Sequence, residues 1–493
     1  MMRRAFLLFT CLLFTTAQGL RAEDIQSEAP SSVVRVNVTN QPWDFVHPWG
    51  KRPPYSRRAI GTILAGNRVL VTAELVANAN YVEFETAEGG QKVPASVEVV
   101  DYEANLALLK TDDLDFLKPF KPLELTPAKI GDVLSVWQLE NNGALLVTKG
   151  PMTTAEVARY PADDSPLLVY RMTTPLQFRD SSFTLPVVKD GKLAGLVMRY
   201  DNTTNNAEVL PAPVIEHFLT DAKKAPYEGF ARLGITSSPT RDPQFRRFLG
   251  LTADTPGGVY ISDVLSDGPA AKGGVEPGDV LLQVDDRPVD QDGNYKDDEY
   301  GKIAITHLLS TRRYDGDVVK LTVYRKGEKK QLDVTLKHRP VESYVIEPYV
   351  YDHAPKFYVL GGLILQELSR QYLKEFGADW QKKAPEQFVY FDRQQNEVFK
   401  NGPKKVVFLN RVLPSDLTIG YEELNQLIVT KINGVSIQSL ADVPGALEKA
   451  SNGLHKVEFD GEPRFIFLDA TAVAAAQESF RQKYRLPALQ RLD

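Results

Sequence analysis

A weak internal repeat in the C-terminal half of the chain restricts its fold more than any other feature of the sequence. Val264 stands sixteen residues before Val280, and Val412 stands sixteen residues before Ile428, with an offset of 148 residues between the two pairs. Each copy has the pattern of a strand, a turn and a second strand. The repeat predicts two related small domains joined by a linker. They are placed at residues 227–338 and 355–493.

The N-terminal half shows a different pattern, in which many short apolar runs alternate with turn residues. Residues 32–38, 59–64 and 68–77 are typical of strands, and residues 186–197 are typical of a hairpin around Asp190-Gly191. A chain of 493 residues is also too long for a single hydrophobic core. We therefore predict a mainly β protein whose first domain, residues 31–223, is an all-β barrel or sandwich.

The first 22 residues have the features of a secretory signal peptide: Arg3 and Arg4 at the start, then an apolar run, then a small and polar end. The apolar run is short for a membrane span of ~20 residues, which disfavours an uncleaved anchor. The only cysteine, Cys11, lies in this segment, so a cleaved chain has no thiol chemistry. We expect a secreted or periplasmic protein with no membrane span after cleavage.

Charge and histidine spacing argue against several classes of ligand. The formal net charge is −6, which gives the chain no general electrostatic reason to bind nucleic acid. The six histidines are scattered, without the spacing of metal ligands. We expect neither a metal nor a cofactor.

Four segments of the N-terminal half resemble the HtrA/Deg serine proteases, closest to the plant-type Deg proteins. They are Arg68-Val-Leu-Val-Thr-Ala-Glu-Leu-Val-Ala77, Asn105-Leu-Ala-Leu-Leu-Lys110, Ser181-Ser-Phe-Thr-Leu-Pro186 and Leu210-Pro-Ala-Pro-Val-Ile-Glu-His-Phe-Leu219. The resemblance implies a trypsin-like double β-barrel followed by two PDZ domains, which are small α+β barrels. It also implies that the catalytic histidine, aspartate and serine are replaced by Glu74, Asn105 and Phe183.

These replacements favour an inactive protease domain, a pseudoprotease. Ser181 and Ser182 are the alternative nucleophiles, but a serine hydroxyl needs a base within hydrogen-bond reach. Glu74 is too weakly basic for that role unless burial raises its pKa. We predict a peptide-binding chaperone or regulatory scaffold. The alternatives are a serine endopeptidase of protein quality control that uses Ser181 or Ser182, and a structural oligomer.

The second domain, residues 227–338, carries the Glu276-Pro-Gly-Asp279 turn and resembles a PDZ domain closely. The resemblance implies that an extended peptide adds to a strand edge beside a helix, with its C-terminal carboxylate at a glycine-containing loop. The alternative is that the same residues only form core. The predicted peptide-binding residues are Arg232, Leu233, Gly234, Ile235, His307 and Leu308.

Two further expectations concern the flanks of this groove. If neutral His307 accepts a hydrogen bond from the peptide, binding should weaken as the pH falls through ~6.5. The acidic stretch at residues 290–299 is expected to be a solvated loop.

The third domain, residues 355–493, resembles the second PDZ domain of plant-type Deg proteins, which implies a role in assembly. The aromatic segment at residues 43–55 lies where that family packs its subunits, and aromatic residues dominate interface energetics. The alternative is that these aromatics only cap their own barrel. Expected partners are C-terminal or unfolded peptides, an active HtrA/Deg relative, and further copies of the chain in a trimer or larger assembly.

Overall fold

The computed structural model describes residues 29–493, apart from residues 163, 178–182, 253, 401 and 403. The predicted signal peptide lies outside the described residues. Among the described residues, no helix has the length and apolar character needed to cross a membrane.

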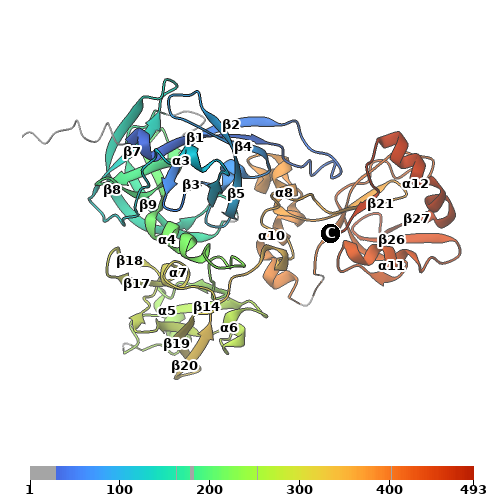
Figure 1. Cartoon of the computed structure of the whole chain (residues 1–493). Helices are drawn as coiled ribbons and strands as arrows, with labels where there is room; N and C mark the ends of the chain where they lie inside the picture. The colour runs from blue at the N-terminus through green and yellow to red at the C-terminus, as the bar shows by residue number, and fades with distance from the viewer. Residues whose placement is uncertain (1–28, 163, 178–182, 253, 401, 403) are drawn as a thin grey trace, which may run out of the picture.

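The first domain consists of two closed six-stranded barrels (Figure 1). The first barrel follows a 3-10 turn, η1 (Ala29–Ser32), and contains β1 (Val33–Asn40), β2 (Tyr55–Leu64), β3 (Arg68–Val71), β4 (Ala79–Glu85), β5 (Lys92–Asp101) and β6 (Leu106–Lys110), with α2 (Ala73–Val76) after β3 and α3 (Leu114–Leu117) after β6. The second contains β7 (Val133–Leu139), β8 (Leu145–Arg159), β9 (Pro166–Thr173), β10 (Leu185–Lys189), β11 (Lys192–Asp201) and β12 (Asn206–Pro211), and α4 (Ala212–Asp221) leads out of it.

The hairpin predicted around Asp190-Gly191 joins β10 to β11. Lys189 pairs with Lys192, and the two turn residues have φ angles of 50° and 75°. Positive φ at both central residues suits the twist of a two-residue hairpin, and aspartate and glycine adopt it at low cost. The mainly β, trypsin-like fold with two further small domains is confirmed.

The first PDZ domain has a sheet in the order β13-β14-β15-β19-β20, with β16 paired to β15. Its elements are β13 (Ile235–Ser238), α5 (Pro243–Phe248), β14 (Val259–Val264), α6 (Pro269–Lys272), β15 (Val280–Val284), β16 (Arg287–Pro288), β17 (Asn294–Asp297), β18 (Gly301–Ala304), α7 (Thr306–Ser310), β19 (Val318–Arg325) and β20 (Glu328–Thr335). One apolar cluster runs without a break from the second barrel into this domain, from Phe218 to Leu336.

The acidic stretch before α7 is not a solvated loop, and that prediction is wrong. Residues 294–304 form the β17–β18 hairpin, in which Tyr295 pairs with Ile303. The side chains of Tyr295 and Asp297 are buried, 4% and 7% exposed. Alternate residues of this charged stretch point inward, as in any strand with one buried face. The prediction of a loop was based on the number of acidic residues and did not consider this alternation.

The second PDZ domain is built on an eight-stranded sheet, in which the path β27-β26-β24-β23-β22-β21-β28 is joined by β25 paired to β24. Its elements are η2 (Val341–Ser343), β21 (Phe357–Leu360), β22 (Leu363–Glu367), α8 (Arg370–Leu373), η3 (Lys374–Phe376), α9 (Trp380–Lys383), α10 (Glu386–Val398), β23 (Val407–Val412), β24 (Leu427–Ile432), β25 (Val435–Ser436), η4 (Leu440–Asp442), α11 (Val443–Leu447), β26 (Leu454–Asp460), β27 (Phe465–Asp469), α12 (Ala470–Tyr484) and β28 (Gln490–Arg491).

The repeat places β22 where β13 stands in the first PDZ domain, because each pairs with the next strand of its own sheet. In the second domain, however, β21 covers the other edge of β22, and β28 pairs with β21.

The aromatic segment after β1 packs against the second PDZ domain of the same chain. Phe45 is 4% exposed in a cluster with Phe388 and Phe408, and the Trp49 ring lies 6.1 Å from that of Phe357. Asn410 donates a hydrogen bond to the Val46 carbonyl at 2.9 Å. This intrachain packing removes the main argument for a subunit interface at this segment.

Candidate functional site

The structure brings together Glu74 and Asn105, two of the three residues that the resemblance to HtrA/Deg proteases places at the catalytic triad. Glu74 lies in the one-turn helix α2, and Asn105 lies immediately before β6. The Asn105 Oδ1 accepts a hydrogen bond from the backbone N–H of Glu74 at 3.0 Å. Asn105 is 2% exposed and has a φ of 53°, a conformation that asparagine tolerates better than most residues. Its amide thus holds the backbone of α2.

Glu74 is largely buried at the histidine position. Burial raises the pKa of its carboxyl above the ordinary glutamate value, although Arg57 and Arg199 oppose the shift. Arg57 also donates a hydrogen bond to the backbone carbonyl of Glu74 at 2.7 Å. A carboxyl group with a raised pKa is a better general base than an exposed one, but it still needs a nucleophile to act on.

Phe183, the residue predicted at the nucleophile position, is part of the first barrel's core. It is 8% exposed and belongs to the cluster that contains Leu75 and Phe116. The Arg57 guanidinium lies 4.2 Å from the centre of its ring. The residue predicted at the nucleophile position is therefore an apolar ring packed in the core. The alternative nucleophiles Ser181 and Ser182 lie outside the described residues.

A cavity of about 540 Å³ lies over Glu74 and Asn105, and residues of the third domain form one of its walls. Tyr351, Gln371 and Glu375 are among these lining residues. Asp352 and Asn78 exchange two hydrogen bonds, of 2.7 and 3.0 Å, beside this wall. The cleft of the first domain is thus partly covered by its own chain, a contact that could not be predicted from local sequence patterns.

A second and larger cavity, of about 1060 Å³, lies along β13 and α7. Leu233, Gly234 and Ile235 line it, as predicted, and Gly234 has a φ of 78° that favours glycine. β13 is an edge strand of its sheet, which is the geometry needed for an extended peptide to add as a further strand. Among the residues of α7, those on the cavity side are Thr306, Leu309 and Ser310.

Arg232 also lines this cavity but already has a carboxylate partner. Its guanidinium lies 3.1 Å from Glu103 and donates a hydrogen bond to Ser165. Burial alone would raise the pKa of Glu103, but Arg232 and His338 lower it overall. Arg232 therefore links the first PDZ domain to the first domain.

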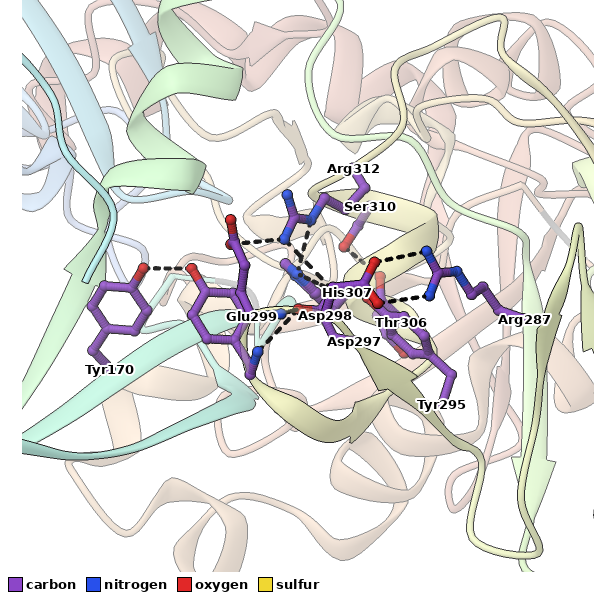
Figure 2. A network of polar contacts seen from close by, with 11 residues as sticks. Tyr170, Arg287, Tyr295, Asp297, Asp298, Glu299, Thr306, His307, Ser310 and Arg312 are labelled. Carbon is purple, nitrogen blue, oxygen red and sulfur yellow. Dashed lines mark hydrogen bonds and ion pairs between the residues drawn. The ribbon is translucent and has the colours of Figure 1, made fainter. Parts of the chain in front are cut away.

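His307 and Leu308 do not line the cavity, and the predicted ligand-selecting role of His307 is not supported by its position. His307 is completely buried on the far face of α7, where its Nε2 accepts a hydrogen bond from Arg312 at 3.3 Å (Figure 2). Burial, with the nearby Arg312 charge, lowers the pKa of His307 to about 4. Leu308 packs against the apolar core. The expected weakening of binding near pH 6.5 therefore cannot come from His307.

A polar network behind α7 connects the groove to the second barrel (Figure 2). Arg312 pairs with Glu299 at 3.0 Å and with Asp297 at 3.5 Å. Tyr300, in the turn between β17 and β18, shares a hydrogen bond with Tyr170 of β9. The hairpin that carries most of this network was predicted to be solvated, so the sequence offered no signal for it beyond two tyrosines in an acidic stretch.

Comparisons with known proteins agree with this architecture. Models of the PDZ domain match residues 231–336 and 346–491. "Protease Do-like 2, chloroplastic" of Arabidopsis thaliana is 26% identical over 442 residues, which cover 87% of this chain and 70% of the relative. "Protease Do-like 4, mitochondrial" of the same plant is 24% identical over 482 residues, which cover 96% and 88%. The chain is an HtrA/Deg-like protein.

A solved structure supports the fold of this HtrA/Deg-like protein. A variant of the HtrA-type protease AlgW, solved with a decapeptide, aligns with a TM-score of 0.50 and 19% identity. The alignment covers 65% of this chain and 97% of that structure. At this identity the likeness concerns the fold alone.

Proposed function

We propose that this HtrA/Deg-like protein binds extended polypeptides through its first PDZ domain and lacks serine-protease activity. One observation carries the proposal: Phe183, which the resemblance to HtrA/Deg proteases places at the nucleophile position, packs in the barrel core. Asn105 adds support, because its amide is bonded to the α2 backbone and carries no negative charge to stabilise an imidazolium. The groove at Leu233, Gly234 and Ile235 supports the binding function.

The proposed ligands are C-terminal or unfolded segments of other proteins, and the proposed role is that of a chaperone-like or regulatory scaffold. An active HtrA/Deg relative is a further proposed partner, and assembly of several copies is proposed by analogy with the family. The proposed location is outside the cytosol. Residues 1–22 support it by their composition, as do the chloroplastic and mitochondrial names of the relatives.

The second candidate function is that of a serine endopeptidase in protein quality control that uses Ser181 or Ser182. Two observations favour it: the relatives are named proteases, and the pKa of Glu74 is raised toward the range of a useful base. One experiment separates the candidates, namely turnover of fluorescent casein by the purified protein and by a Ser181→Ala/Ser182→Ala double variant. We expect no turnover by either. Turnover that the double variant loses would establish the endopeptidase, and turnover that survives would indicate a contaminating protease.

A further inference from the structure

The peptide groove opens into a junction of all three domains. Besides β13 and α7, its walls include Arg159 and Ser165 of the first domain, Arg339 and Tyr344 of the linker, and Asn396 of α10. The cavity is lined by six lysine and arginine residues against four aspartates, although the whole chain has a net charge of −6. Such a local excess of cations favours an anionic ligand.

Most of these cations have partners or are solvated. Arg370 pairs with Asp392 and Asp164, at 3.1 and 3.2 Å. Lys337 pairs with Asp315 at 2.7 Å, and Arg232 pairs with Glu103. Arg159 and Lys272 are exposed to solvent. The charges of these residues are therefore either paired with carboxylates or exposed to solvent before any ligand binds.

Arg339 differs from all of them. It is half-buried, and among the described residues it forms no ion pair. Its guanidinium lies 3.7 Å from the centre of the Tyr344 ring and donates one hydrogen bond to Asn396 Oδ1 at 3.2 Å. Burial lowers the pKa of Arg339 and Arg232 lowers it further, whereas Tyr344 and Asp267 act in the opposite direction. Partial burial of an uncompensated cation is costly, and a carboxylate would relieve that cost.

The backbone places Arg339 at the carboxylate end of the groove. The N–H of Arg232 donates to the Lys337 carbonyl at 3.0 Å, so the chain around residue 337 runs beside the loop that continues into Leu233 and Gly234. That loop is the proposed position of the peptide's end. Arg339 follows Lys337 by two residues and lines the same cavity.

We propose that Arg339 binds a carboxylate of the polypeptide ligand, either the chain terminus or the side chain of an aspartate or glutamate near it. The proposal rests on the proposed peptide-binding function. It assigns recognition of the ligand carboxylate to Arg339 of the linker, because Arg232 is already paired with Glu103. Tyr344 and Asn396 orient the guanidinium, so the complete site requires the linker and α10 as well as the first PDZ domain. Arginine suits this role because its planar fork can donate two parallel hydrogen bonds to a carboxylate.

The test uses the full chain and fluorescein-labelled Gly-Ser-Gly-Ser-Gly-Tyr-Val-Val as the probe. Three forms are compared by fluorescence anisotropy: the free acid, the C-terminal amide, and an amide whose last residue is aspartate. Arg339→Met removes the charge and keeps an unbranched side chain over Tyr344, and Arg339→Lys keeps the charge without the fork. Arg247→Met is the matched control, since it removes an exposed cation of the first PDZ domain that does not line the cavity. Thermal unfolding monitors the fold of each variant.

We expect Arg339→Met to weaken binding of the free acid about ten- to a hundredfold, the range for hydrogen bonds to a charged group. It should also remove the preference for the free acid over the amide, with an intermediate loss in Arg339→Lys and none in Arg247→Met. An Arg339-dependent gain for the aspartate amide over the plain amide would identify side-chain recognition, and its absence would restrict the site to chain termini. Equal affinities in wild type and Arg339→Met would overturn the proposal. If Gly234→Pro abolished binding in that case, the proposed peptide-binding function of the groove would stand without the role of Arg339. If the wild-type protein bound none of the peptides, the peptide-binding function and the role of Arg339 would both be contradicted.

Discussion

Tyr300 of the first PDZ domain and Tyr170 of the second barrel share a hydrogen bond between their hydroxyl groups, with 2.6 Å between the oxygens. Both side chains are buried, and burial raises the pKa of Tyr170 to about 12. Tyr300 stands in the turn of the hairpin that leads directly into α7. This contact therefore fixes the helix beside the peptide groove against a different domain.

The first prediction concerns the energy of that contact. Tyr300→Phe and Tyr170→Phe should each destabilise the protein by about 1–3 kcal/mol, because each leaves a buried hydroxyl without its partner. The double variant should cost less than the sum, with a coupling energy of about 1 kcal/mol. Urea unfolding of the four proteins measures the cycle. Additive losses would show that the two hydroxyls are not coupled.

The second prediction concerns the nucleophile position. Phe183→Ser should produce no casein turnover, because the base position holds Glu74 and the third position holds an asparagine. It should also lower the unfolding free energy by about 3–5 kcal/mol, the usual cost of truncating a buried phenylalanine. Phe183→Leu, the size-conserving control, should cost roughly 1.5 kcal/mol or less. Turnover that appears in Phe183→Ser alone would show that the remaining site is competent.

The third prediction concerns pH and the loop between β5 and β6. Asp101 is buried there beside Glu103, accepts hydrogen bonds from Tyr227 and the Ala104 N–H, and lies near His338. Burial and the Glu103 charge raise the pKa of Asp101 to about 6. The folded state therefore holds this proton more tightly than the unfolded state. The resulting stability is complete below pH ~4 and is lost as the pH rises to about 6.

The comparison of wild type with Asp101→Asn isolates this effect, since the variant cannot ionise at this position. Between pH 4 and 7, wild type should lose on the order of 3 kcal/mol more unfolding free energy than the variant. Urea unfolding at half-unit pH steps gives both curves. The pKa of His338 is also raised above its ordinary value, despite burial, mainly by Glu103 and in part by Asp101, so the difference between the curves includes the loss of this smaller interaction. Parallel curves would mean that Asp101 ionises at its ordinary pH.

The fourth prediction concerns selectivity in the groove. Leu309 lines the cavity and also belongs to the apolar core cluster, whereas Leu308 packs against that cluster without lining the cavity. Leu309→Ala should weaken binding of a peptide that ends in valine or leucine by up to about fiftyfold, because it removes the equivalent of three methylene groups of apolar side chain. Leu308→Ala on the same helix should leave the affinity unchanged after correction for any loss of folded protein. Calorimetry with the full chain tests both variants.

The strand pattern and the repeat were sufficient to predict a mainly β chain with two related small domains, because alternation and turn chemistry are local properties of the sequence. The Asp190-Gly191 hairpin and the glycine at position 234 are examples. The trypsin-like and PDZ folds were expected from the resemblance to HtrA/Deg proteins. The helix face of the groove was not predictable in this way. α7 has five residues, so a rotation of one position exchanges Leu309 for Leu308, and only the contacts of Tyr300 and Asp297 behind the helix decide the orientation.

The roles of Arg232 and Arg339 depend on a different kind of information. Neither arginine belongs to a recognisable sequence motif. Only the arrangement of the three domains shows that Glu103 forms an ion pair with Arg232 and not with Arg339. Contacts between residues more than a hundred positions apart, such as Asp352 with Asn78, leave no periodic trace. For this reason the sequence did not predict that residues of the C-terminal half partly cover the cleft at Glu74.

The pairing of β21 with β22 has a consequence for stoichiometry. In the first PDZ domain the edge strand β13 is open to an added strand, whereas in the second the chain itself has supplied that strand. The two halves of the repeat are therefore unequal as receptors. A titration of the full chain with an extended peptide should saturate at one peptide per chain, whatever the number of chains in the assembly.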